Sequence, residues 1–145
     1  MTDPCVQDVE KGNDNGELGH HIQVSLLVCR PRAWQGKAEI PLDDARELAC
    51  AICKAVEMRH EGLHAALWTF PAFDQGGEGW TFVQPIITSF LALDKWTFLD
   101  GTRALYLHLV SCKPFDRRVV IREIDAAGLE VVDQLHSTLS ARVGA

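Results

Sequence analysis

The chain has 145 residues, of which 47% are apolar, and a formal net charge of −6. This length and composition predict one globular domain, and the negative charge argues against a nucleic-acid or acidic-membrane partner, because phosphate binding depends on clustered Lys and Arg. No apolar run approaches the ~20 residues that span a bilayer, and five cysteines without a secreted disulfide pattern favour free thiols in a cytoplasmic protein.

The first third of the chain predicts a tail, a strand and a helix. Residues 1–18 are polar and acidic, which predicts a flexible tail ahead of a single domain at residues 19–145. Residues 21–29 are mostly apolar and favour a buried strand. Residues 43–59 predict a helix, because acidic residues begin it and apolar residues recur at helical spacing. Gly62 is expected to end this helix.

The middle of the chain predicts strands. Residues 65–70 favour a strand, and residues 71–79, with three glycines, predict a loop that could lie over a site. Residues 81–96 predict a hairpin. A turn at Asp100-Gly101 then leads into a strand at residues 104–112.

The C-terminal region is less clear. Residues 119–124 fit either a short strand or the start of a helix. Leu129, Val132, Leu135 and Leu139 recur at helical spacing, which predicts a final amphipathic helix at residues 129–143. The predicted strands outnumber the helices and are joined by short links. The expected fold class is therefore α+β, a two-layer sandwich with a mainly antiparallel sheet and helices packed on one face.

Two patterns suggest metal or redox chemistry, but a simpler interpretation is favoured for both. Cys50 and Cys53 form a C-x-x-C motif inside the predicted helix, where a thiolate gains nothing from a helix N-terminus. We interpret them as small buried apolar residues. His60 and His64 have ligand spacing, but Gly62 interrupts any helix between them. No metal site is predicted.

Chemistry looks possible at the predicted hairpin. Thr88 and Ser89 lie near its apex, and a hydroxyl (Thr81), a carboxylate (Asp94) and a thiol (Cys112) accompany them in the flanking strands. A serine at such a place is most often a turn residue. A wider pattern of motifs gives Ser89 another interpretation.

Three segments carry this pattern. GHHIQVSLLVC (residues 19–29) has a glycine, a histidine and an apolar strand ending on cysteine. GWTFVQPIITS (residues 79–89) has a glycine, a hydroxyl residue, an apolar strand and a serine, and residues 104–112 form a strand that closes on Cys112. In this order, residues 19–125 resemble the small prokaryotic S-adenosylmethionine decarboxylases.

The resemblance implies a reaction. In that family the serine hydroxyl attacks the carbonyl before it, and β-elimination leaves a pyruvoyl group that forms a Schiff base with the substrate amine and acts as an electron sink. It therefore implies cleavage between Thr88 and Ser89, with the pyruvoyl cofactor made from Ser89. Thr81 would assist processing, and Cys112 would reprotonate the substrate carbon.

The resemblance also implies substrate contacts at Phe70, Phe90 and Trp96, and a homodimer or a paired paralogue. The chain departs from the family pattern near the serine. Thr88 replaces a glutamate, Phe90 a histidine, and Asp94 the later histidine that serves in processing. The elimination needs a base near the Ser89 α-carbon, and Asp94 is the candidate. An acidic residue there would also suit a cationic amino acid.

The sequence leaves the function open between alternatives. The first is a self-processing, pyruvoyl-dependent decarboxylase of S-adenosylmethionine or a related amino acid, such as arginine or ornithine, in polyamine biosynthesis. The second is a non-processing homologue that binds or regulates a partner or metabolite. The third is an unrelated α+β domain whose motifs match by accident.

Overall fold

A computed structural model describes residues 21–32, 40–60, 62–73 and 77–140. The tail expected at residues 1–18 lies outside this part of the chain. The described elements follow in the order β1 (His21–Pro31), α1 (Leu42–Ala55), β2 (Ala66–Phe73), β3 (Gly77–Ile86), β4 (Ser89–Thr97), β5 (Arg103–Ser111), α2 (Arg117–Ala126) and β6 (Leu129–Ser140).

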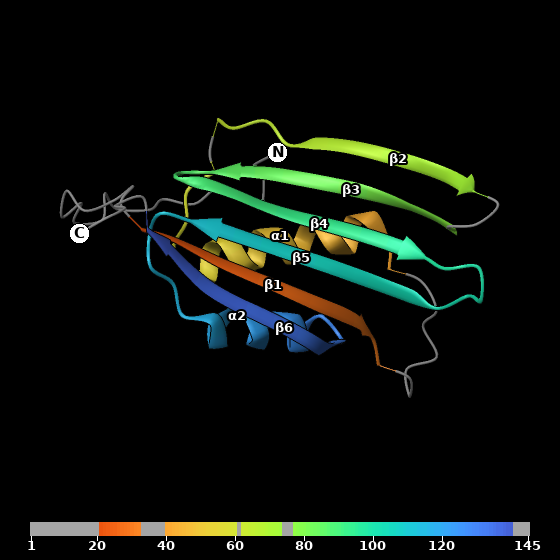
Figure 1. The fold of residues 1–145 in the computed structure, drawn as a ribbon. Helices are drawn as coiled ribbons and strands as arrows, with labels where there is room; N and C mark the ends of the chain where they lie inside the picture. Colours follow the sequence, from red (N-terminus) through yellow and green to blue (C-terminus); the bar gives the residue numbers. More distant parts are fainter. Residues whose placement is uncertain (1–20, 33–39, 61, 74–76, 141–145) are drawn as a thin grey trace.

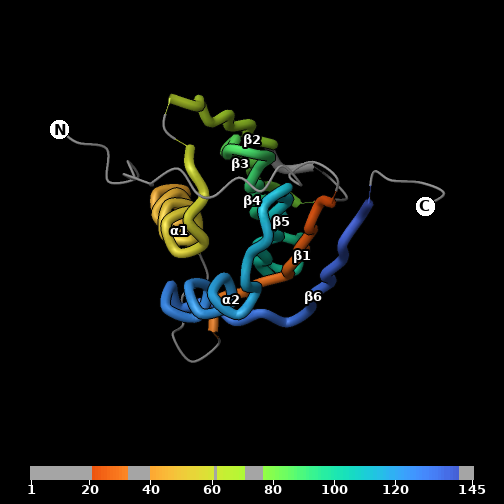
Figure 2. Tube along the Cα trace, turned by 90° about the vertical axis from the view of Figure 1, so that its left-hand side faces the viewer, coloured from red at the N-terminus to blue at the C-terminus, as the bar shows by residue number. Residues whose placement is uncertain are grey.

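The strands form one six-stranded sheet in the order β2-β3-β4-β5-β1-β6 (Figure 1). Every neighbouring pair is antiparallel. Strands β2, β3 and β4 each pair with the next strand in sequence, whereas β1 inserts between β5 and β6. Figure 2 shows α1 and α2 on the same side of the sheet. The prediction of an α+β sandwich with helices on one face is therefore confirmed.

Alternation along the strands separates a buried face from an open one. Leucines on the face toward the helices are fully buried and form the core with Ile52, Val120 and Ile124; they are Leu27, Leu91, Leu93, Leu105, Leu107 and Leu109. The intervening side chains point to the opposite face, which no described element covers. We call this second surface the open face.

Helix α1 is shorter than predicted. Pro41 is its N-cap residue, and Asp43 and Asp44 occupy the first turn, where the helix dipole favours acidic groups. The chain leaves the helix after Ala55, because Glu57 has a φ of 58° and the Met58 N–H donates to the Cys53 carbonyl at 2.8 Å. Gly62 therefore does not end the helix.

The prediction of a helix at residues 129–143 is wrong. Residues Leu129–Ser140 form β6, which pairs with β1 along nearly its whole length. Leu129 is buried, but Leu135 is 61% exposed, so the apparent helical stripe is not a buried stripe. The helical spacing of the apolar residues gave the wrong prediction, because a sequence pattern cannot show that one edge of β1 is available for pairing with another strand. Pairing with that edge satisfies the backbone of both strands.

One other region differs from the sequence interpretation, and the structure decides an alternative that the sequence left open. Residues 71–73 belong to β2 and residues 77–79 to β3, so most of the predicted loop is strand; residues 74–76 lie outside the described part. The ambiguous residues 119–124 lie in α2. Asp116 caps this helix by accepting the Arg118 N–H at 2.9 Å.

The cysteines only partly match the expectation of free thiols. Cys29, Cys53 and Cys112 are free, and the first two are buried. Cys50 is disulfide-bonded, so the expectation was wrong for this residue. A cytoplasmic location stays a prediction.

Burial should make protein stability fall at high pH. Burial raises the pKa of Cys29 and of Cys53 from 9.0 to about 12. A raised folded-state pKa contributes stability that is complete below pH 9 and lost as the pH rises towards 12. The raised pKa of each thiol should therefore lower the free energy of unfolding by about 1.4 kcal/mol for each pH unit above 9.

Urea unfolding at pH 8 and pH 10 measures this loss. Cys29→Ala is the control, because removing one thiol should make the loss smaller. An equal loss in both proteins would show that the buried thiol does not contribute.

Candidate functional site

The tip of the β3–β4 hairpin carries the bond predicted to break. Ile86 pairs with Ser89, so Ile87 and Thr88 form a two-residue connection. Thr88 is exposed and Ser89 is half-buried. Ser89 has a φ of 147°, a region that residues with a side chain avoid at a cost of about 1–3 kcal/mol. The Thr88–Ser89 bond therefore lies at an accessible and strained position.

Two other segments hold this tip. The Cys112 N–H donates to the Thr88 carbonyl at 3.2 Å, and the Ile87 N–H donates to the Arg59 carbonyl at 2.8 Å. Ser111, at the end of β5, pairs directly with Ser89. The structure thus brings Cys112 beside the carbonyl that the Ser89 hydroxyl would attack.

Thr81 and Asp94 lie elsewhere on the hairpin. They are direct cross-strand partners, and the Thr81 hydroxyl donates to Asp94 Oδ1. Asp94 is five residues from Ser89 along β4, which corresponds to about 17 Å. Within one chain the structure therefore separates Thr81 and Asp94 from Thr88, Ser89 and Cys112.

His108 is a site residue that the sequence reasoning missed. Its Nε2 lies 3.4 Å from Asp94 Oδ2, and both side chains are partly exposed on the open face. The signal was present in residues 104–112: the leucines at 105, 107 and 109 alternate with residues that must point the other way. We call Thr81, Asp94 and His108 the open-face cluster.

The predicted substrate contacts separate into two places. Phe70 and Trp96 lie together, with ring centroids 6.4 Å apart and planes inclined by 54°. A Cβ added to Gly79 would lie 2.6 Å from Trp96 Cε3, so the indole packs directly over this glycine. Phe90 instead follows Ser89 at the tip and is 37% exposed. The aromatic pair is therefore near Asp94, and Phe90 is near the cleavage position.

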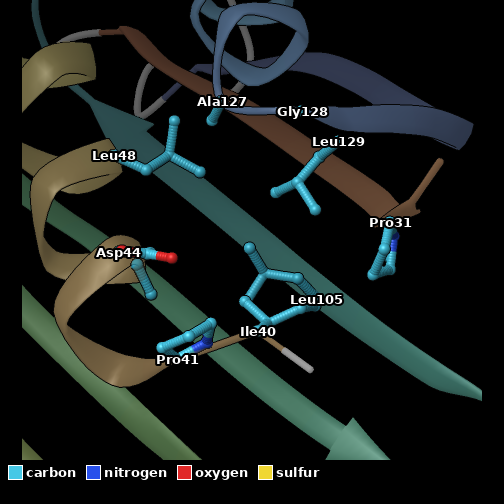
Figure 3. A pocket seen from close by; sticks show the side chains of 10 residues that line it. Pro31, Ile40, Pro41, Asp44, Leu48, Leu105, Ala127, Gly128 and Leu129 are labelled. Carbon is cyan, nitrogen blue, oxygen red and sulfur yellow. The ribbon is translucent and has the colours of Figure 1, made fainter. Parts of the chain in front are cut away.

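A small cavity of about 70 Å³ lies among α1, β1, β5 and the start of β6, lined by Leu48, Leu105 and Leu129 among others (Figure 3). Leu105 is six residues from Ser111 along β5, or about 20 Å. This cavity is therefore at the opposite end of the sheet from Ser89.

A larger polar groove of about 430 Å³ lies between the start of α2 and strands β1 and β6. Within it, Ser25 Oγ is 2.7 Å from His136 Nδ1. Burial, and then the positive charge of Arg117, lower the pKa of His136. Gln23, which also lines the groove, pairs with Ser111. The groove therefore begins two strands from Ser89, about 10 Å away.

The described part of the chain contains neither a metal-binding cluster nor a membrane-spanning helix. No group of three or more His, Cys, Asp or Glu residues there could hold a metal ion. Neither described helix has the length and apolar character needed to cross a bilayer.

Comparisons with known proteins show what the fold resembles. No protein-family model matches the sequence, and no curated protein matches it. The structure is similar to the crystal structure of the adenosylmethionine decarboxylase from Aquifex aeolicus VF5, with a TM-score of 0.52 and 15% sequence identity. The match covers 86% of this chain and 94% of that one. At this identity the likeness shows a shared fold.

Proposed function

We propose that the chain cleaves itself between Thr88 and Ser89 and then acts as a pyruvoyl-dependent decarboxylase of an amino acid. The observation that carries this proposal is the geometry of the hairpin tip. Ser89 has a strained backbone, and the carbonyl before it accepts the Cys112 N–H at 3.2 Å. The fold shared with an adenosylmethionine decarboxylase supports the same reaction.

The tip residues can perform the first step. The Ser89 hydroxyl attacks the Thr88 carbonyl carbon, and the Cys112 N–H stabilises the negative charge that develops on the carbonyl oxygen. The amide C–N bond breaks, an ester to Ser89 Oγ forms, and the nitrogen keeps the proton from the hydroxyl. This step also releases Ser89 from its positive φ, which favours the ester by about 1–3 kcal/mol.

The second step produces the ketone. A base removes the proton from the Ser89 α-carbon, the Cβ–Oγ bond breaks, and Thr88 leaves as a carboxylate. Water then replaces the nitrogen on Ser89, which departs as ammonia. The residues present fit this product, because the tip is accessible and the free, half-buried Cys112 lies beside it.

A pyruvoyl ketone supplies an electrophilic carbon that holds a substrate amine and draws electrons from the bond to the departing carboxylate. Cys112 has a suitable position to deliver the proton that the substrate carbon then requires. Asp94 and the Phe70–Trp96 pair offer a carboxylate and aromatic faces, which suit an organic cation. We propose S-adenosylmethionine or a cationic amino acid such as arginine or ornithine as substrate, in polyamine biosynthesis.

A second copy of the chain would complete the site. Asp94 lies about 17 Å from Ser89 along the strand, too far to act within one chain. Apolar side chains are exposed on the open face, among them Trp68 at 53% and Leu135 at 61%. Apolar patches of this kind mark interaction surfaces. We propose a homodimer in which the two open faces pack together and each tip meets the partner's open face.

Intact mass spectrometry of the purified protein tests the proposal. Two pieces are expected, one ending at Thr88 and one beginning at position 89 with a ketone in place of the amine. Hydride reduction in the presence of substrate should attach the substrate to the second piece. A single full-length mass would overturn the proposal.

One observation favours a non-processing protein that binds a metabolite. The polar groove beside α2 is lined by Gln23, Ser25 and His136 and needs no cleavage to accept a small polar ligand. In this case the full-length mass would be accompanied by a co-purified compound. Thr138→Phe would fill the groove and release that compound.

A further inference from the structure

We propose that the polar groove between the start of α2 and strands β1 and β6 binds a small oxyanion, the carboxylate or phosphate group of a metabolite, with Arg117 as its cationic contact. The groove has a volume of about 430 Å³, within the range of small-molecule sites. This inference rests on the metabolite-binding candidate and names the charge of its ligand. It does not require cleavage at Ser89.

The charged groups at the start of α2 leave one cation unpaired. Asp116 accepts from Arg118 Nε at 3.1 Å and from Arg118 Nη2 at 2.9 Å. These hydrogen bonds lower the pKa of Asp116, so it stays ionised and is balanced by Arg118. Among the ion pairs of the described residues, none includes Arg117. The groove therefore has one net positive charge when His136 is neutral.

Arg117 lies where a bound anion would meet it. It is one of the residues that line the groove, together with His136. Its positive charge is, after burial, the second cause that lowers the pKa of His136, so its field reaches the interior of the groove. A guanidinium group presents forked donors that match a carboxylate or a phosphate.

Uncharged donors lie beside this cation. The Phe115 N–H donates to Gln23 Oε1 at 3.4 Å, which leaves the Gln23 amide nitrogen as a donor for a ligand. Thr138 is the cross-strand partner of Gln23, and both residues line the groove. An amide and a hydroxyl from adjacent strands therefore accompany the guanidinium, as the several oxygens of an oxyanion require.

A further donor depends on the protonation of His136. Its Nδ1 lies 2.7 Å from Ser25 Oγ, and its Nε2 lies 2.8 Å from Gln134 Oε1. Because an amide oxygen only accepts, Nε2 carries a proton, and the Ser25 hydroxyl donates to Nδ1 of the neutral ring. In the charged ring, Nδ1–H donates to Ser25 Oγ instead. The hydroxyl proton of Ser25 is then available to an anion in the groove.

Anion binding should therefore be coupled to proton uptake by His136. The titratable groups that face it from α2 are Asp116 and Arg117, and β1 and the same face of β6 contribute only uncharged groups there. A bound anion offsets the Arg117 charge, so the pKa of His136 should rise on binding. The affinity for the anion should consequently be higher at low pH and fall as the imidazole loses its proton.

NMR titration of the purified full chain tests this proposal, with sodium acetate as the carboxylate probe and sodium sulfate as the phosphate probe. Both probes stay ionised between pH 6 and pH 8, and sodium chloride keeps the ionic strength constant. The Ser25 amide and the His136 ring should shift saturably with at least one probe, and more tightly at pH 6. Saturation by acetate identifies a carboxylate ligand, and saturation by sulfate a phosphate ligand.

Two substitutions should change the affinity in opposite directions. Arg117→Gln should weaken binding about 10-fold or more, because hydrogen bonds from a charged donor are the strong ones. Asp116→Asn should tighten binding, because asparagine keeps a helix-capping oxygen but removes the negative charge and releases Arg118. A damaged fold cannot produce this gain. His136→Gln should remove the dependence of the affinity on pH.

Arg30→Gln is the matched control. It makes the same change of charge on β1, seven residues from Gln23 and thus about 23 Å away. Arg30 is exposed and contacts Glu130 at 3.2 Å, an ion pair outside the groove. This variant should bind either probe as wild type does. A loss equal to that of Arg117→Gln would show only a general effect of net charge and would overturn the site.

The outcomes separate this inference from self-cleavage. If neither probe gives a saturable shift, or if Arg117→Gln binds as tightly as wild type, the anion site is overturned and cleavage at Ser89 is unaffected. A pH-independent affinity overturns the coupling to His136. An uncharged compound that co-purifies in the groove overturns the anionic ligand but leaves the metabolite-binding candidate. Intact mass decides self-cleavage without reference to any of these results.

Discussion

Ser89→Ala is expected to remain a single intact chain under conditions in which wild type separates at the Thr88–Ser89 bond. Alanine has no hydroxyl to attack the Thr88 carbonyl, so neither the ester nor the ketone can form. Intact mass and a denaturing gel measure the result. Two pieces from Ser89→Ala would contradict the assignment of this hydroxyl as the nucleophile.

Two variants at the same end of the sheet serve as controls. Ser111→Ala removes a hydroxyl from the residue paired with Ser89 but leaves the proposed nucleophile, so cleavage should continue. Cys112→Ala keeps the backbone N–H that contacts Thr88 but loses the thiol. It should therefore lose carbon dioxide release far more than cleavage. Equal loss of both would argue against a role of the thiol in turnover.

Leu107→Ala is expected to destabilise the folded state by about 2–5 kcal/mol, because it leaves a cavity in the centre of the core. Leu107 is fully buried on β5, between its partners Leu93 on β4 and Leu27 on β1. This loss is a large fraction of the stability of an ordinary domain, about 5–15 kcal/mol. The midpoint of urea unfolding measures it.

Leu99→Ala is the matched control for the core substitution. Leu99 lies between β4 and β5 and is 65% exposed, so the same change should alter stability by about 0.5 kcal/mol or less. Equal effects of the two substitutions would contradict the packing of the sheet against α1 and α2.

Local patterns predicted much of the β3–β4 hairpin. The sequence placed a turn between Thr81 and Trp96, and the structure has Ile87 and Thr88 as a two-residue connection. Cys112 was expected near Ser89 only through a family resemblance. Strand β5 brings it there, because pairing Ser89 with Ser111 leaves the next residue beside Thr88.

The rest of the site could not be predicted from spacing along the chain. Asp94 is close to Ser89 in sequence, but an extended strand turns five residues into about 17 Å. His108 is far from Asp94 in sequence, but pairing of β4 with β5 places their side chains 3.4 Å apart. A sequence motif gives only the number of residues between two side chains, whereas a reaction between them depends on their distance in the folded sheet.

The sequence by itself determined the fold class and the hairpin, because alternation and turn residues are local properties that tertiary contacts did not override. Only the tertiary structure decided that residues Leu129–Ser140 form a strand, since the free edge of β1 offers hydrogen bonds that no local pattern records. It also decided which side chains meet. Cross-strand pairing joins residues far apart in the chain, and it alone brings Thr81, Asp94 and His108 together.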